Sequence, residues 1–257
     1  IGLDVHVNDD DDGGDRDSKI TWRDKSDNAY QDPGVFGTAE LAGLVGWWKF
    51  DEGQGNIAAD SSGNGNNGTL EGNPAWQPAG GKIGGAISLD GDGDYIDLPV
   101  GSVISYLPEC TFSTWVNWSG EGAPWQRILD FGTDEGNYVY VCPSSGDSNS
   151  LRVAITAGNG IWDEFDSTRG ALTPGWHHIT VTFSKNSGLM ALYLDGEIVG
   201  SKNDCVNSIS DLGNVTNNWL GRSQYPSDPY FNGSLDDFRI YNYALNDNEI
   251  LALYNGK

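Results

Sequence analysis

Oxygen-bearing side chains gather in one Gly- and Asn-rich segment that follows an apolar run. Asp51 and Asp60 are followed by Asn64 and Asn66, and glycines between them leave the backbone carbonyls accessible. Calcium takes about six to eight oxygen ligands from carboxylates, amides, backbone carbonyls and water. A distant acidic position, Asp236, opens another apolar run, and the two elements could share one ion. The same side chains could instead only form Asx turns with the loop backbone.

Aromatic side chains are abundant, with 10 Trp and 11 Tyr. Aromatic faces stack on the C–H groups of sugar rings, although most rings of a folded domain are expected in its core. Four rings stand in Gly- and Pro-rich loop contexts, where packing explains them less well. They are Trp125, Trp162, Tyr225 and Tyr230, with Arg222 and Asp228 as polar neighbours. These six residues form the predicted ligand-binding set.

The charge balance excludes several classes of partner. Lys and Arg total 14 against 37 Asp and Glu, which gives a net charge of −23. A chain this acidic repels nucleic acid and anionic membranes, and it favours solubility and divalent cations. No run of about 18 apolar residues occurs, so no membrane insertion is predicted. The 3 cysteines match no zinc or redox pattern and allow at most one disulfide within the chain.

Short apolar runs separated by glycine-rich turns predict an all-β protein. Asp195-Gly196 is a hairpin signal between two such runs. Asn246 and Glu249 have the spacing of a capping box, which predicts one short helix near the C-terminus. The predicted strands are 45–51, 67–71, 84–90, 93–98, 110–118, 126–132, 136–142, 150–157, 162–168, 176–184, 188–195, 197–201, 216–220 and 234–242.

A series of motifs occurs in a fixed order along the second part of the chain. The motifs are Gly46–Gly53, Asp60–Gly68, Ile87–Ile96, Phe112–Val116, Gly175–Val181, Leu192–Gly196 and Gly233–Asn242. In this order, residues 44–257 resemble a bacterial laminin G-like jelly roll of the concanavalin A-like lectin and glucanase superfamily. The resemblance implies a two-sheet antiparallel jelly-roll sandwich, and it implies a structural calcium ion held by the acidic loop together with Asp236. This fold hosts lectins, enzymes and adhesion modules, so the function stays open.

Catalysis finds little support in the residues. Retaining glucanases of this superfamily carry their carboxylates on one strand, in a Glu-x-Asp-x-x-Glu or Glu-x-Asp-x-Glu pattern. The nearest string begins with Glu164 and Asp166, and neither possible third position is Glu. His177 and His178 are adjacent on a predicted strand, so they point to opposite faces and cannot chelate one ion together. No catalytic residue is predicted, and the chain is expected not to be an enzyme.

The first part of the chain has a different character. The segments Leu3–Asp9, Thr21–Asp24 and Asp27–Gly37 resemble the C-terminal end of a family 9 carbohydrate-binding module, which is several times longer. Residues 1–41 are therefore interpreted as an acidic, strand-containing remnant of a preceding β-sandwich module, and 42–257 as the laminin G-like domain. The chain starts in an alternating run without a signal peptide, which indicates a portion of a longer protein.

These observations favour a non-catalytic, calcium-stabilised carbohydrate-binding module of a larger secreted or cell-surface protein, with a polysaccharide or glycan as its partner. The alternative is an adhesion or self-assembly module that binds protein. In that reading, strands at Ile1–Val7 and Lys19–Trp22 would pair with an open sheet edge, either of the same chain or of another copy. The predicted calcium ligands are Asp51, Asp60, Asn64, Asn66 and Asp236.

Overall fold

The computed structural model describes residues 43–256. These residues belong to the unit Gly43–Lys257, one of the two into which the chain divides. The strands predicted at Ile1–Val7 and Lys19–Trp22 lie outside the described residues. In the part of the chain from 43 to 256, no helix is long and apolar enough to cross a membrane.

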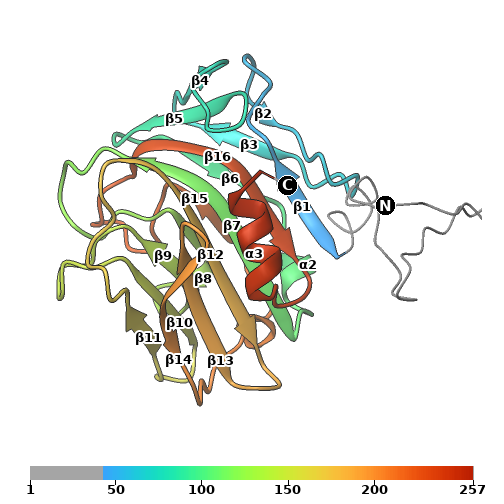
Figure 1. Ribbon diagram of the computed structural model, residues 1–257, viewed down its shortest axis with the longest axis vertical. Helices are drawn as coiled ribbons and strands as arrows, with labels where there is room; N and C mark the ends of the chain where they lie inside the picture. Colours follow the sequence, from blue (N-terminus) through green and yellow to red (C-terminus); the bar gives the residue numbers. More distant parts are fainter. Residues whose placement is uncertain (1–42, 257) are drawn as a thin grey trace, which may run out of the picture. The chain divides into compact units, whose positions relative to one another are not determined.

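Two antiparallel sheets of eight strands each form a sandwich (Figure 1). The first sheet has the order β14-β13-β12-β7-β16-β5-β4, and β1 also pairs with β16. Its strands are β1 (Leu44–Trp48), β4 (Ala75–Gln77), β5 (Ala86–Asp90), β7 (Glu109–Trp118), β12 (Gly175–Ser184), β13 (Leu189–Leu194), β14 (Glu197–Lys202) and β16 (Asn232–Tyr241). The all-β, two-sheet prediction is confirmed.

The second sheet has the order β11-β10-β9-β8-β15-β6-β3-β2. Its strands are β2 (Ile57–Ala58), β3 (Gly68–Glu71), β6 (Tyr95–Asp97), β8 (Leu129–Asp134), β9 (Asn137–Cys142), β10 (Arg152–Ala157), β11 (Asp163–Asp166) and β15 (Asn217–Leu220). Each predicted strand range overlaps an observed strand. The prediction missed β2 and β4, because two or three residues are too few to display an alternating pattern.

Three short helical segments complete the described part: α2 (Gly101–Ile104), the 3-10 turn η1 (Ile209–Leu212) and α3 (Asp247–Tyr254). The predicted C-terminal helix is α3. Its cap residue, Asn246, accepts hydrogen bonds from the backbone of Asn248 and Glu249, and Glu249 accepts one in return from Asn246 N. The ring of Tyr254 lies 5.6 Å from that of Trp115, so α3 packs on the outer face of the first sheet (Figure 1).

The core lies between the two sheets, where large side chains from both meet. Phe112 of β7 contacts Phe131 of β8 edge-on, with ring centroids 5.4 Å apart. Phe131 in turn contacts Phe238 of β16, and Phe238 contacts Trp48 of β1. All four side chains are buried. Burial of each contributes on the order of 2 kcal/mol or more, so this chain of rings holds the sheets together. Cys110, Cys142 and Cys205 are free thiols.

The loop 60–66 covers the edge of β1 that faces away from β16. Asp60 accepts hydrogen bonds from the backbone N–H groups of Trp47, Ser62 and Asn66 at 2.8–3.0 Å. Asn64 donates to Leu44 O, and the Asn66 side chain donates to Val45 O. These bonds satisfy backbone groups that an edge strand would otherwise offer to another chain.

The hydrogen bonds of this loop favour the ionised form of Asp60. Burial opposes its ionisation, but the hydrogen bonds from Ser62, Asn66 and Trp47 outweigh burial and hold the pKa of Asp60 below its usual value of 3.8. A carboxylate with a lowered folded pKa stabilises the fold above the unfolded pKa. That stability is lost as the pH falls through the folded value.

Asp60→Asn is therefore expected to lower the free energy of unfolding by about 1–2 kcal/mol at pH 7, because three charge-assisted hydrogen bonds weaken. Its loss of stability between neutral pH and pH values below 3.8 should be smaller than that of the wild type. Urea unfolding at several pH values measures both. Asp134→Asn, an exposed aspartate that accepts one bond from Gly136 N, is the control. Equal pH slopes for all three proteins would contradict the assignment.

Candidate functional site

The outer face of the second sheet carries polar and aromatic side chains because its strands alternate. In β9, Val139 and Val141 enter the core, and Tyr138 and Tyr140 project from the other face. In β8, Leu129 and Phe131 enter the core while Asp130 lies with the tyrosines. Sheet alternation therefore places two phenol rings and a carboxylate side by side.

Strand register arranges this face into a row that runs across the strands. Glu164 of β11 pairs with Ala154, Ala154 with Tyr140, Tyr140 with Asp130, and Asp130 with Trp219 of β15. Neighbouring strands lie about 4.8 Å apart, so the row from Glu164 to Trp219 spans on the order of 19 Å. Loops from several parts of the chain border the part of this row between Glu164 and Asp130.

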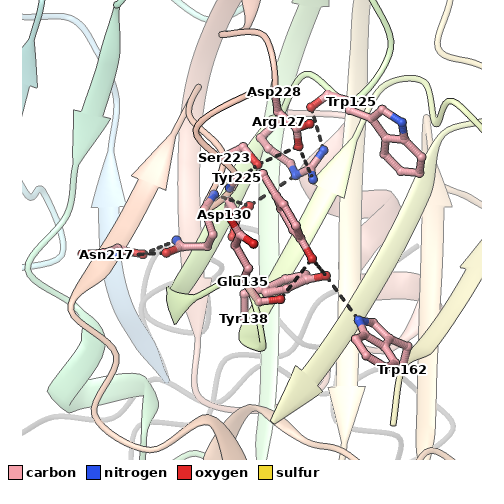
Figure 2. Close-up of polar contacts among 11 residues, drawn as sticks. Trp125, Arg127, Asp130, Glu135, Tyr138, Trp162, Asn217, Ser223, Tyr225 and Asp228 are labelled. Carbon is pink, nitrogen blue, oxygen red and sulfur yellow. Dashed lines mark hydrogen bonds and ion pairs between the residues drawn. The ribbon is translucent and has the colours of Figure 1, made fainter. Parts of the chain in front are cut away.

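These loops and the sheet enclose a pocket of about 310 Å³. It is lined by Trp125, Arg127, Tyr138, Tyr140, Asp147, Arg152, Trp162, Glu164, Tyr225 and Asp228. Four of the six predicted ligand-binding residues are thus brought together: the aromatic residues Trp125, Trp162 and Tyr225, with Asp228. Figure 2 shows the two indole rings at opposite ends of the site, Trp125 near the top of the view and Trp162 near the bottom.

Arg127 ties the 223–228 loop to the sheet (Figure 2). Its Nε donates to Asp130 at 3.2 Å, its Nη2 to Asp228 at 2.9 Å, and its Nη1 to the carbonyl of Trp125 at 2.6 Å. Its guanidinium also lies 4.1 Å from the centroid of the Tyr140 ring. The side chain is only 3% exposed, so one buried cation positions two loops and a ring of the pocket.

Asp130 is the anchor beneath that loop. It is fully buried, and its Oδ2 accepts from both Arg127 and the backbone N–H of Gln224. Burial raises the pKa of Asp130 to about 7, although the Arg127 charge and the Gln224 bonds favour the carboxylate. Ser223 completes the anchor by donating to Asp228 at 2.9 Å.

The phenol groups form a second set of contacts. Trp162 Nε1 donates to Tyr138 Oη at 3.3 Å, and the Tyr138 and Tyr225 hydroxyls lie 3.5 Å apart. Tyr225 Oη donates to the carbonyl of Glu135 at 3.0 Å, which fixes the ring as one wall of the pocket (Figure 2). Burial raises the pKa of Tyr138 and of Tyr140, so both phenols are neutral at physiological pH.

Trp125 holds an unusual backbone conformation. Its φ is +74°, a left-handed value that costs a non-glycine residue about 1–3 kcal/mol and that is concentrated at functional sites. Its ring lies 5.7 Å from the Arg127 guanidinium and 5.6 Å from that of Arg152. A Cβ atom at Gly146 would lie only 2.3 Å from the indole nitrogen, so glycine there makes room for the ring. Trp162, by contrast, is 50% exposed.

Arg152, which also lines the pocket, is surrounded by carboxylates. Its Nε and Nη2 donate to Asp166 at 2.7 and 3.1 Å. Its Nη1 donates to Asp147 at 3.0 Å and lies 3.6 Å from Glu164. Glu164 and Asp166, the nearest match to a catalytic carboxylate pattern, thus share one face of β11 and pair with the same arginine. The pocket combines aromatic faces with carboxylate acceptors, an arrangement that suits a polar ring bound between them.

Arg222 and Tyr230 lie in a separate group on the same face. The Arg222 guanidinium lies 4.0 Å from the ring of Trp219 and 4.8 Å from that of Tyr95. The Tyr230 ring lies 6.3 Å from Tyr95. Trp219 and Tyr140 are two strands apart in the row, about 10 Å. The pocket that holds Trp125 and Trp162 is lined by none of the four residues of this group, which are Tyr95, Trp219, Arg222 and Tyr230.

Six residues that line the pocket escaped the prediction from sequence: Arg127, Tyr138, Tyr140, Asp147, Arg152 and Glu164. An available signal was alternation, since Tyr138 and Tyr140 flank Val139 in a pattern that points both rings away from the core. Nothing in the local sequence indicates that Asp147 and Glu164 meet at Arg152. That meeting depends on the pairing of β10 with β11 and on the loop after β9.

The predicted calcium ligands fall into two groups. Asp60, Asn64 and Asn66 lie in the loop that covers the edge of β1. Asp51 and Asp236 instead contact the segment 81–85: Asp51 accepts from Gly85 N at 2.6 Å, and Asp236 accepts from Ile83 N at 2.8 Å. From 43 to 256, no three His, Cys, Asp or Glu side chains come close enough to hold a metal by themselves.

Asp236 differs from the other four residues in having a buried oxygen without a partner. It is fully buried, and its Oδ1 has no hydrogen-bond partner among the described residues. Burial raises the pKa of Asp236 to about 7, and the nearby carboxylates of Asp237 and Asp51 add to the shift. A calcium ion at this point would satisfy Oδ1 and offset the repulsion. It would draw most of its oxygen ligands from backbone carbonyls and water.

The two adjacent histidines separate as the strand geometry requires. His178 is buried beside Ser113 and Trp115, and burial lowers its pKa to about 3. His177 lies on the other side of β12 and contacts Thr173 and Asp195. The two imidazole rings therefore have separate surroundings and could not bind one ion together.

The comparisons with known proteins agree with this architecture. Residues 90–251 match the family model of the concanavalin A-like lectin/glucanases superfamily, and the chain belongs to that superfamily. Residues 1–44 match the model described as carbohydrate family 9 binding domain-like. Both resemblances inferred from the motifs are thus confirmed.

Individual relatives are more distant. The human (Homo sapiens) neuronal pentraxin receptor is 27% identical over 145 residues, which cover 51% of this chain and 28% of that protein. Domain 4 of AbnA, a GH43 extracellular arabinanase from Geobacillus stearothermophilus solved in complex with arabinotriose, is 24% identical with a TM-score of 0.70. That match covers 82% of this chain and 98% of that domain.

Toxin binding domains share the fold as well. The binding domain of Paraclostridial Mosquitocidal Protein 1 is 19% identical with a TM-score of 0.63, and the match covers 84% of this chain and 52% of that one. At these identities the similarity to solved structures shows the fold alone.

Arg127→Met should destabilise the domain by about 3–5 kcal/mol, because it leaves the buried carboxylate of Asp130 and the partly buried carboxylate of Asp228 without their cation. Arg169→Met is the matched control. Arg169 is 47% exposed and pairs with Glu197 on the surface, so its loss should cost less than about 1 kcal/mol. Urea unfolding compares the two variants. Similar losses of stability would mean that the Arg127 network does not hold the site together.

Proposed function

We propose that this domain is a non-catalytic carbohydrate-binding module of a larger secreted or cell-surface protein. The observation that carries the proposal is the pocket in which Trp125, Trp162 and Tyr225 surround a set of carboxylates. Sugar rings present C–H faces that stack on aromatic rings and hydroxyl groups that donate to carboxylates, so one ligand can use both features. Membership of a lectin and glucanase superfamily supports the same class of ligand.

Two further comparisons support the proposal. The arabinanase domain that shares the fold was solved with arabinotriose, and residues 1–44 match a carbohydrate-binding family. We place the primary sugar contacts at Trp125, Trp162, Tyr225 and Asp228. Arg222 and Tyr230, beside Trp219, would contact longer chains that pass beyond the pocket.

The alternative function, protein adhesion or self-association through residues 1–41, stays a prediction. Light scattering that compares the full chain with a chain starting at Leu41 would test it, since equal monomeric masses would exclude a role in assembly. Within the described domain, the cover that Asp60 and its loop place on the edge of β1 disfavours strand addition at that edge.

Trp162→Ala should weaken glycan binding by about tenfold or more, equivalent to about 1.4 kcal/mol, because it removes a stacking ring. Its melting temperature should be nearly unchanged, since half of the side chain is exposed. A glycan array identifies ligands, and calorimetry with those ligands and with arabinotriose measures affinity. Because the module is proposed to be non-catalytic, incubation of these glycans with the protein should produce no new reducing ends.

Tyr106→Ala is the matched control, because its ring is 82% exposed and lies outside the pocket. This variant should bind as the wild type does. A folded protein that binds no glycan on the array would refute the proposed function.

We further propose that calcium stabilises the domain through Asp51 and Asp236. The loop with Asp60, Asn64 and Asn66 would supply additional oxygen ligands. Calcium would supply the positive charge that links the segment after β1, the segment 81–85 and the middle of the final strand, β16. The partnerless Oδ1 of Asp236 supports this placement.

The melting temperature should fall in chelator and recover with calcium. At calcium concentrations 100 times the dissociation constant, the expected stabilisation is about 2.7 kcal/mol. Asp236→Asn should lose this response. Asp60→Asn, measured in the same way, separates the two groups of predicted ligands. If the melting temperature of this variant still responds to calcium, the Asp60 loop only covers the edge of β1. A wild-type melting temperature that ignores exhaustive chelation, with no metal by elemental analysis, would contradict the proposal.

A further inference from the structure

The charged groups that line the pocket differ in how much of their hydrogen-bonding capacity remains open. Each nitrogen of Arg127 already donates to an acceptor, and so does each nitrogen of Arg152. Both guanidinium groups are also largely buried, with side chains 3% and 9% exposed. An anionic ligand is bound most strongly by a guanidinium that presents two parallel N–H groups. The Nη atoms of both arginines keep a second N–H group, but these guanidinium groups are buried and already paired with carboxylates, so they offer little surface to a ligand.

The carboxylates retain free acceptor atoms. Asp228 uses Oδ2 for both Arg127 and Ser223, and among the described residues its Oδ1 has no partner. Asp147 and Glu164 each direct one oxygen at Arg152, and their side chains are 70% and 44% exposed. The ionised groups that the pocket exposes to a ligand are therefore acceptors.

The neutral lining groups add no charge, although the Tyr140 hydroxyl and Trp125 Nε1 have no hydrogen-bond partner among the described residues and can donate to a neutral or an acidic ligand alike. Trp162 Nε1 and the hydroxyls of Tyr138 and Tyr225 are engaged with one another or with Glu135 O. Two arginines face three lining carboxylates, and Asp166 behind them adds a further negative charge. A ligand carboxylate would enter a negative potential and find no unoccupied cation, which costs affinity and slows encounter.

We infer that the pocket selects uncharged sugars and rejects their uronic acid counterparts. This inference rests on the proposed function and names the class of ligand that the same pocket takes. Hydroxyl groups of a neutral sugar donate to the open oxygens of Asp147, Glu164 and Asp228 while a ring face stacks on Trp162 or Trp125. A uronic acid has a carboxylate at C6 in place of a hydroxymethyl group, so it loses a donor and adds a repelled charge.

The test uses pairs of oligosaccharides that share linkage and ring configuration and differ only at C6. Trisaccharide pairs of glucan with glucuronan, mannan with mannuronan, and galactan with galacturonan are measured by calorimetry at low and high salt. The wild type should bind at least one neutral member about tenfold or more tightly than its acidic counterpart at low salt. The ratio should shrink as salt screens the carboxylates.

Glu164→Gln supplies the local test, since the amide keeps the shape and removes one charge while Arg152 keeps Asp166. The variant should narrow the ratio of neutral to acidic affinity at least twofold. Glu197→Gln is the control, because it makes the same change in total charge on β14, outside the pocket, and should leave the ratio unchanged.

The outcomes are distinguishable. Acidic members that bind as tightly as their neutral counterparts would overturn the selectivity and leave the proposed function standing. A Glu164→Gln ratio equal to that of the wild type would overturn the assignment of selectivity to the pocket carboxylates. Failure of all six trisaccharides and of the glycan array would overturn both the proposed function and this inference.

Discussion

The site depends on one buried cation. Arg127 lies under the 223–228 loop, and its three nitrogens join the carbonyl of Trp125, the carboxylate of Asp130 and the carboxylate of Asp228. A buried charge is tolerated only when it is paired and hydrogen-bonded, so this network has little freedom to rearrange. It positions the loop that carries Tyr225 and the strained backbone of Trp125. The aromatic walls of the pocket therefore follow from an ion pair that the ligand itself has no need to touch.

The pairing of the arginines within the protein also bears on the ligand that the pocket is proposed to bind. Because the two arginines are buried and paired while they hold loops and strands, the charged groups that the pocket leaves exposed are carboxylates. The acidic balance of the whole chain, with a net charge of −23, acts in the same direction as these local groups. In the proposed recognition of sugars, the buried cations have the structural role and the partly exposed anions contact the ligand.

Elsewhere in the domain, carboxylates accept hydrogen bonds from backbone N–H groups. Asp60 caps the edge of β1 and keeps its charge because three N–H groups converge on it. Asp236 accepts from Ile83 N and retains an oxygen without a partner in a buried setting. The contrast explains why their pKa values move in opposite directions. Asp60 gains more from hydrogen bonds than burial costs, whereas Asp236 is buried near the carboxylates of Asp51 and Asp237.

Local patterns in the sequence were enough for the class of fold, the strands and the final helix. Alternation has a period of two residues and a capping box spans four, so both are legible in short windows, as at Tyr138–Val141 and Asn246–Glu249. The loop contexts of Trp125, Trp162 and Tyr225 likewise indicated exposed rings. Strands as short as β2 carried no such pattern and were missed.

Only the tertiary structure decided which of these residues meet. Asp228 reaches Arg127 across 101 positions of sequence, and Arg222 joins Trp219 and Tyr95 instead of the pocket. The predicted calcium ligands divide between a strand edge and the segment 81–85 for the same reason. Strand order across a sheet and the convergence of loops are set by packing between distant segments, and no short window of sequence contains that information. The sequence by itself thus determined the strands and the candidate rings, and the lateral order of the strands determined the site.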